Sequence, residues 1–215
     1  MPADPHTRLL TSAAREVLQP LGLRQRGRSR TWLDDHGWWL GVVEFQPSSW
    51  AKGSYLNVGG MWLWQEPGHH VAFDVGHRVD GAGFIEYRSD DQFAPEARRL
   101  AVLASEEIQR LRITLSDLDA AIAWLRDHSE GRQGWPGYNL GVALRLGGHQ
   151  TESAKTLRGL AQEADDPEWR HRAVARAHEL GDLIDRDSAA FRAEIHSAIT
   201  ACRASLRLEP HAPSL

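Results

Sequence analysis

The sequence predicts an α+β protein, in which an N-terminal helix packs on an antiparallel sheet of three to five strands and a helical C-terminal region follows. Two observations carry this prediction. Residues 31–64 hold six of the nine tryptophans and read as apolar strands joined by turns. From Pro95 onward the apolar residues instead recur every three to four positions, which is the helical period. Because water penalises exposed indole rings, we expect the segment 31–64 to form the covered core of the molecule.

The first predicted element is an amphipathic helix over residues 7–19, where leucine, alanine and valine recur at helical spacing. Pro20 and Gly22 end this pattern. Residues 24–30 then alternate arginine with other residues and lead into a first strand near residues 30–33. The following residues, 34–37, predict a turn, because Gly37 can take the positive φ that closes a short hairpin.

Residues 38–45 are apolar on both alternating faces, which is typical of a central strand. Glu44 is the one acid in this strand, and a structural pair with an arginine is the expected partner. Residues 46–53 predict a loop, and residues 55–64 predict a further strand. The Gly59-Gly60 pair inside that strand indicates a bulge or a close backbone contact. Residues 71–73 and 84–87 are weaker strand candidates.

Helical patterns occupy the remainder of the chain. A long helix is predicted from Pro95 and a second from Ser116, then helices over 138–146, 151–164, 167–184 and 188–208. Residues 140–148 resemble a tetratricopeptide-type helical hairpin near 138–164, and a single hairpin is favoured over a repeat array because one copy is visible. We therefore expect an α+β domain over residues 1–112 and a helical region over residues 113–215.

Composition limits the class of protein. The chain has 215 residues and a formal net charge of −4, which argues against a protein devoted to nucleic acid. Cys202 is the one cysteine, so the sequence excludes an intrachain disulfide and a thiolate-rich metal site. No run of residues is long and apolar enough for a membrane span, and the N-terminus has no leader pattern. These features predict a cytoplasmic protein without a membrane partner.

Arg24, Arg26, Arg28 and Arg30 are the first candidate binding residues. At a spacing of two they would project from one face of an extended chain and could hold phosphate or an acidic protein surface. The alternative is a solvated edge strand, in which the charges discourage aggregation.

Gln46, Trp50 and Asn57 are the second candidate set, because they lie at the ends of two neighbouring predicted strands. Their amides could simply hold a loop through backbone hydrogen bonds. They could also line a binding pocket, since clefts with aromatic walls and a few polar groups bind small molecules.

Histidines and carboxylates give little chemistry. His69, His70, Asp74 and His77 could be written as a metal-ligand set, but glycines and valines among them make solvated turn residues the expected state. The sequence contains no phosphate-binding glycine loop, no HExxH and no nucleophile with a plausible base. We accordingly predict no catalytic residues, no metal ligands and no cofactor.

The N-terminal half resembles a bacterial family catalogued as domain of unknown function 4304. The segments PLGLRQRGRSRTW, VVEFQPSSW and YLNVGG carry the resemblance, which covers roughly residues 8–112. The resemblance implies a small soluble bacterial protein and supplies no catalytic residues to carry over; some members have the character of accessory or immunity proteins that act by binding.

Together these features predict a non-enzymatic module that binds another protein, of an immunity or defence accessory type. Two alternatives stay open. One is a small-molecule-binding protein or an unrecognised enzyme with a tryptophan-lined pocket at Gln46, Trp50 and Asn57. The other is nucleic-acid binding through residues 24–30, which would weaken steeply with salt.

Overall fold

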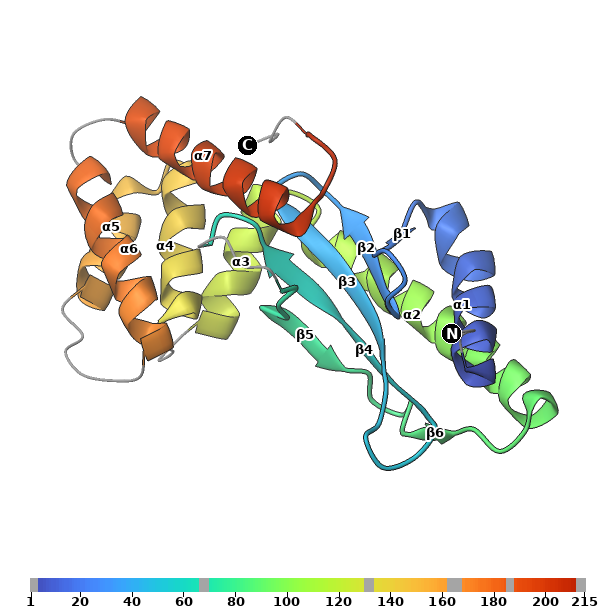
Figure 1. Ribbon diagram of the computed structural model, residues 1–215. Helices are drawn as coiled ribbons and strands as arrows, with labels where there is room; N and C mark the ends of the chain where they lie inside the picture. Colours follow the sequence, from blue (N-terminus) through green and yellow to red (C-terminus); the bar gives the residue numbers. More distant parts are fainter. Residues whose placement is uncertain (1–3, 66–69, 130–133, 162–167, 185–187, 212–215) are drawn as a thin grey trace. The chain divides into compact units, whose positions relative to one another are not determined.

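The computed structural model describes residues 4–65, 70–129, 134–161, 168–184 and 188–211 (Figure 1). The chain forms two compact units. The first unit comprises Met1–Met61 and Val71–Ile113, and the second comprises Trp62–His70 and Thr114–Leu215. The first contains the sheet and the second contains most of the helices, so the predicted α+β class is confirmed.

The sheet of the first unit has the strand order β1-β2-β3-β4-β5. Strand β2 pairs antiparallel with both β1 and β3, and β4 pairs antiparallel with β5 and, at its start, with β6. The bounds are β1 Arg24–Gln25, β2 Thr31–Asp35, β3 Trp39–Gln46, β4 Gly53–Trp62, β5 Val75–Arg78 and β6 Ile85–Glu86.

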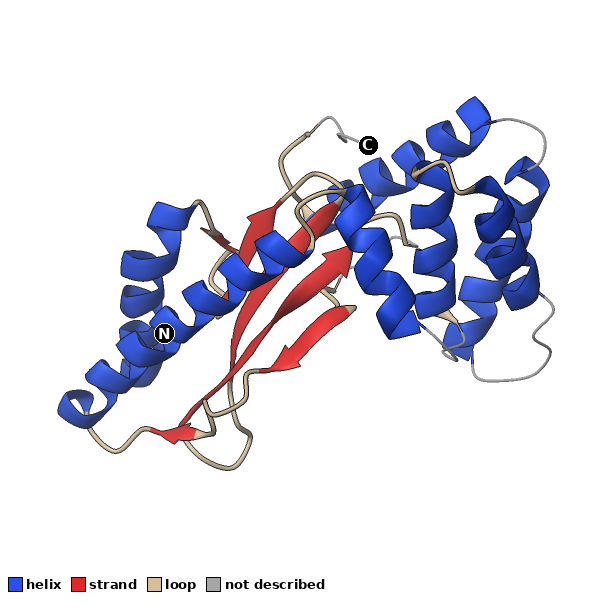
Figure 2. Ribbon diagram, turned by 180° about the vertical axis from the view of Figure 1, so that it is seen from behind, coloured by secondary structure: helices blue, strands red, loops and turns tan. Residues whose placement is uncertain are grey.

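Two helices, α1 (Pro5–Leu18) and α2 (Asp90–Thr114), cover one face of this sheet (Figure 2). A short 3-10 helix, η1 (Gln19–Leu21), continues α1, and Gly22 ends it at a φ of 93°. Apolar side chains of both helices meet alternate residues of the strands, so this core lies on one face of the sheet. The core between them includes Leu10, Leu18, Trp32, Phe45, Leu56, Leu100 and Ile108.

Several predicted boundaries are wrong. The strand expected at 71–73 is absent, and the pairing strand is β5, whose Val75 lies opposite Gly60. Close approach of the two backbones decides this register, because a Cβ added at Gly59 would lie 2.1 Å from the Val75 carbonyl oxygen. Helix α2 begins at Asp90 and not at Pro95, since two aspartates in its first turn favour the helix N-terminus.

The buried tryptophans confirm that the segment 31–64 lies inside the protein. The buried ones are Trp32, Trp38, Trp39, Trp62 and Trp64. Trp50 is the exception, because it lies in the loop between β3 and β4 and the residue is 78% exposed.

The second unit is a stack of helices: α3 Leu118–Ser129, α4 Trp135–Leu146, α5 Gln150–Ala161, α6 Glu168–Ile184 and α7 Ser188–Leu206. Helix α4 packs against α3, α5 and α6, while α6 also packs against α5 and α7. Most residues of α4 are buried, which is the pattern of a central helix. Cys202 is a buried thiol in α7, as predicted.

Helices α4 and α5 are in close contact at Gly141. A Cβ added there would lie 2.5 Å from Leu157 Cγ, and Ser153 Oγ donates a hydrogen bond of 2.7 Å to the Gly141 carbonyl oxygen. We expect Gly141→Val to lower the free energy of unfolding by about 1–3 kcal/mol through overpacking. Gly159→Val on α5 is the matched control, because its Cβ would meet nothing within 4 Å. Urea unfolding that shows equal stability for the two variants would contradict this close-contact role.

Candidate binding site

Polar side chains of three neighbouring strands are linked by hydrogen bonds in the first unit. Asn57 on β4 donates through Nδ2 to Glu44 Oε2 at 2.9 Å and to Gln46 Oε1 at 3.1 Å, both on β3. Arg78 on β5, which lies directly opposite Asn57, donates through Nη2 to Gln46 Oε1 at 2.6 Å. Because residues alternate along a strand, these side chains lie on the sheet face opposite the one that α1 and α2 cover.

Three aromatic rings extend this polar group. The guanidinium carbon of Arg78 lies 3.8 Å from the centroid of the Tyr55 ring. Tyr55 contacts Phe84 at a centroid distance of 4.9 Å, and Phe84 stacks on Trp50 at 6.0 Å with 14° between the planes. We call this set the aromatic–amide patch; it consists of Glu44, Gln46, Trp50, Tyr55, Asn57, Arg78 and Phe84.

The structure brings Gln46, Trp50 and Asn57 into this patch. Gln46 and Asn57 are in direct contact, whereas Trp50 is connected to them through two other aromatic residues. Sequence reasoning missed Tyr55, Arg78 and Phe84. The one available signal was the spacing of two between Tyr55 and Asn57, which places both on one strand face. The sequence predicts an arginine partner for Glu44, whereas among the described residues the contact of its carboxylate is the Asn57 amide.

The four arginines predicted as one basic face do not form one. Strand β1 contains only two residues, and the chain then turns, with Ser29 N donating to the Arg26 carbonyl oxygen at 3.0 Å. Arg24 lies opposite Leu33 and is exposed, while Arg28 lies in the exposed turn. A binding role for these residues stays a prediction, now without a shared face to support it.

Arg30 joins α1 to the sheet. Its Nη2 lies 2.6 Å from both His6 Nε2 and Thr7 Oγ1, and its Nη1 donates to the Gly53 carbonyl oxygen at 3.2 Å. Burial, followed by the charge of Arg30, lowers the pKa of His6. His6 is therefore a neutral acceptor for the guanidinium, and Arg30 acts in the fold as a cross-link between elements.

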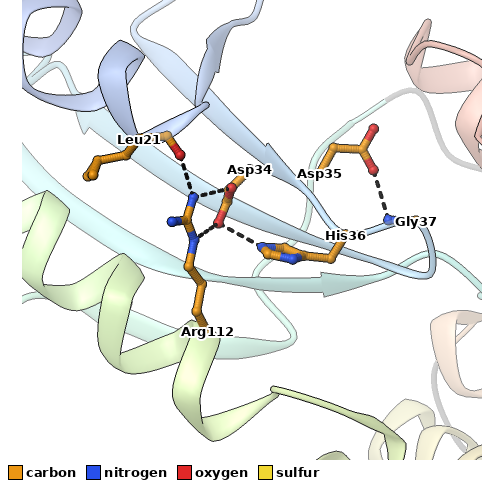
Figure 3. A network of polar contacts seen from close by, with 6 residues as sticks. All are labelled: Leu21, Asp34, Asp35, His36, Gly37 and Arg112. Atoms are coloured by element: carbon orange, nitrogen blue, oxygen red, sulfur yellow. Dashed lines mark hydrogen bonds and ion pairs between the residues drawn. The ribbon is translucent and has the colours of Figure 1, made fainter. Parts of the chain in front are cut away.

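A second polar network lies at the end of β2 (Figure 3). Arg112 on α2 donates through Nε and Nη2 to the two carboxylate oxygens of Asp34, at 2.8 and 2.7 Å, and Nη2 also donates to the Leu21 carbonyl oxygen. His36 Nε2 lies 2.8 Å from Asp34 Oδ2. Burial alone raises the pKa of Asp34, but the hydrogen bonds from Arg112 and His36 outweigh it and hold the pKa below its ordinary value.

This network is an ion pair that stabilises the fold. An aspartate–histidine contact is also a component of acid–base sites. Here, however, both oxygens of Asp34 are occupied by Arg112, and the His36 ring stacks on Trp39 at 4.1 Å. The contacts described for Asp34 and His36 include no nucleophile.

The histidine set is only partly described. His69 lies outside the described residues, and the side chain of His77 is likewise not described. Within the part of the chain that the structure describes, no group of three or more histidine, cysteine, aspartate or glutamate side chains could hold a metal ion. His70 and Asp74 precede β5 and lie outside it.

An open depression of about 390 Å³ lies beside β1 and the end of α1. Its lining includes Arg15, Arg24 and Trp32, but none of Gln46, Trp50 or Asn57. The tryptophan-lined pocket predicted at those three residues is thus not this depression.

In the second unit, the end of β4 packs with helix α4. Trp64 Nε1 and Gln65 Nε2 each donate to Asn139 Oδ1 at 3.1 Å, and the Tyr138 hydroxyl donates to the Trp64 carbonyl oxygen at 3.3 Å. Burial raises the pKa of Tyr138 to about 12, so this hydroxyl remains a donor at all ordinary pH values. Two buried side chains of α4 thereby hold the residues that follow β4, Tyr138 through the Trp64 backbone and Asn139 through the side chains of Trp64 and Gln65.

Antiparallel helices that pack in sequence define the class of this unit as a tetratricopeptide-like helical stack. The family model described as the protein kinase G tetratricopeptide repeat matches residues 86–181, from β6 through most of α6. This match extends beyond the single hairpin expected near 138–164. Neither the curated proteins nor the solved structures contain a match to the chain.

The match also corrects the resemblance to domain of unknown function 4304. The family that the comparison supports is the tetratricopeptide one, over residues that mostly follow the segments on which that resemblance was based. Those segments are short, and VVEFQPSSW and YLNVGG are rich in common strand residues, which recur in unrelated sheets and so carry little family information. Among the helices that the structure describes, none is long and apolar enough to cross a membrane.

Proposed function

We propose that this protein is a non-enzymatic module that binds another protein. The observation that carries the proposal is the tetratricopeptide-like helical region matched over residues 86–181. Stacked helical repeats present extended surfaces on which each helix pair adds contact area, and such surfaces suit polypeptide partners. The role does not require a catalytic residue or a cofactor.

The first unit adds support of a different kind. Its aromatic–amide patch contains two exposed residues, Trp50 and Arg78, and tryptophan and arginine are residue types that dominate the energetics of protein interfaces. Because Trp50 is exposed, packing in the hydrophobic core does not explain why this position carries a large aromatic side chain. The proposal does not extend to an immunity or defence role, since the family resemblance that suggested it is corrected.

Affinity capture with the full-length chain tests this function. The immobilised chain is exposed to a lysate of its source cells, and retained proteins are identified by quantitative mass spectrometry against a heat-unfolded sample of the same chain. We expect at least one protein to be retained only by the folded chain, to bind again as a purified component with saturation, and to protect backbone amides from hydrogen exchange. Retention of the same proteins by the unfolded sample, or of none in either, would refute a protein-binding role.

A further inference from the structure

Arg78 is held in place without a carboxylate partner among the described residues. Its guanidinium lies on the Tyr55 ring at 3.8 Å and donates to Gln46 Oε1 at 2.6 Å, with a longer contact of 3.5 Å from Nε to Asn57 Oδ1. Other arginines, such as Arg8 and Arg126, instead face an aspartate or a glutamate. Three neutral groups therefore orient Arg78, and the Glu44 carboxylate reaches this network only through Asn57 and not by direct contact with the guanidinium.

Hydrogen-bond donors of the patch remain open. Within the described part of the chain, Arg78 Nη1 and Gln46 Nε2 have no protein acceptor. The other polar side-chain atoms of these two residues bond to each other or to Asn57. A guanidinium edge that presents two parallel N–H groups matches the two oxygens of a carboxylate. Because ring stacking already restricts the arginine, little conformational entropy is lost when such a ligand binds.

The apolar part of the patch lies on the other side of Tyr55. Phe84 and Trp50 continue the stack, and Trp50 is 78% exposed to water. An aromatic or aliphatic side chain placed on these rings would remove apolar area from solvent. A ligand with both a carboxylate and an apolar group next to it would thus contact both halves of the patch.

We propose that the aromatic–amide patch binds a surface segment of a partner protein in which an acidic residue lies beside an aromatic or aliphatic one. The inference rests on the proposed protein-binding function and names the chemistry of the partner. Charge complementarity favours a single carboxylate over a polyphosphate chain. One arginine supplies the positive charge of the patch, and the Glu44 carboxylate in the same hydrogen-bonded group would repel further negative charges. The open donors and the exposed ring then account for specificity and affinity respectively.

Defined peptides test the proposal on the full-length chain. The probe is an acetylated and amidated heptapeptide that carries one glutamate and one tryptophan in a glycine–serine background, and its control replaces the glutamate with glutamine. Binding is followed by NMR through the side-chain Nε–H resonance of Arg78. We expect a Kd on the order of 1 mM, and a weakening of about tenfold or more for the glutamine peptide.

Variants separate the two halves of the patch. Arg78→Gln should weaken binding of the glutamate peptide about tenfold and Trp50→Ala about fivefold. Arg98→Gln, at an exposed ion pair on α2, should leave binding unchanged.

Several outcomes would count against the assignment. No binding to the wild-type chain at a peptide concentration 10-fold above the expected Kd, or equal binding to Arg78→Gln, would overturn the proposal. Tighter binding of an eight-nucleotide oligothymidylate through Arg78 would overturn the assignment to a protein carboxylate. A native partner that binds wild type and Arg78→Gln equally would leave the proposed function standing and refute this inference alone.

Discussion

Replacement of Trp64 by alanine is expected to lower the free energy of unfolding of the second unit by about 3–5 kcal/mol. The side chain is fully buried, and its ring stacks on Trp62 with centroids 5.0 Å apart. The substitution removes these contacts, leaves a cavity, and takes away one of the two donors that reach Asn139 Oδ1. The loss exceeds that of an ordinary surface substitution several-fold.

Urea unfolding followed by circular dichroism measures this loss, and hydrogen exchange of the α4 amides locates it in the second unit. Trp50→Ala is the matched control, because it removes the same side chain from an exposed position. We expect the control to change stability by no more than about 0.5 kcal/mol. Equal unfolding midpoints for the two alanine variants would show that Trp64 does not hold α4 to the end of β4.

The second large effect is expected for Asp34→Asn. The Asp34 side chain is 7% exposed and that of Arg112 is 30% exposed, so the bidentate pair is largely shielded from water. Removal of the negative charge leaves a partly buried guanidinium without its counter-ion, which costs about 3 kcal/mol. Replacement of both residues, as in Asp34→Leu with Arg112→Met, should recover much of this loss, because no unpaired charge then remains.

The same pair makes stability depend on pH. Since the pKa of Asp34 is lower in the folded chain than its ordinary value of 3.8, the folded state favours the ionised carboxylate. This contribution is complete above the unfolded pKa and is lost as the pH falls through the folded pKa. We expect the acid-induced loss of stability below about pH 4 to be smaller in Asp34→Asn than in wild type.

Asp35→Asn is the control for both measurements. Asp35 follows Asp34 in sequence, is exposed, and accepts a hydrogen bond of 3.0 Å from Gly37 N through one oxygen, which an asparagine can also do (Figure 3). A stability–pH curve of Asp34→Asn that coincides with those of wild type and Asp35→Asn would contradict the role of the Asp34–Arg112 pair.

Local patterns predicted the elements of this fold better than they predicted its candidate site. Alternating apolar residues located β3 and β4, and helical periodicity located α1 and the helices after residue 117. The patch was only half predicted. Gln46 and Asn57 were accessible because both lie at positions of recognisable strands, whereas Arg78 and Phe84 come from weakly patterned residues after Asp74. Their contacts with Gln46 and Tyr55 join positions far apart in the chain.

The arginines at residues 24–30 show the opposite failure. Their spacing of two indicated one face of an extended chain, but the backbone turns after Gln25. Arg30 lies in contact with His6 and Thr7 of α1, which no local pattern contains. Charge spacing describes a surface only when the backbone conformation between the charges is known.

The sequence by itself determined the α+β class, the interior position of most tryptophans and the helical nature of the C-terminal half, because hydrophobic periodicity reports burial one element at a time. Only the tertiary structure decided that Trp50 is exposed, that Trp64 and Gln65 contact α4, and that Arg78 completes the patch. Those outcomes depend on which elements meet. Strand register and helix packing set them through contacts between residues that are distant in sequence, and such contacts leave no mark in the local pattern.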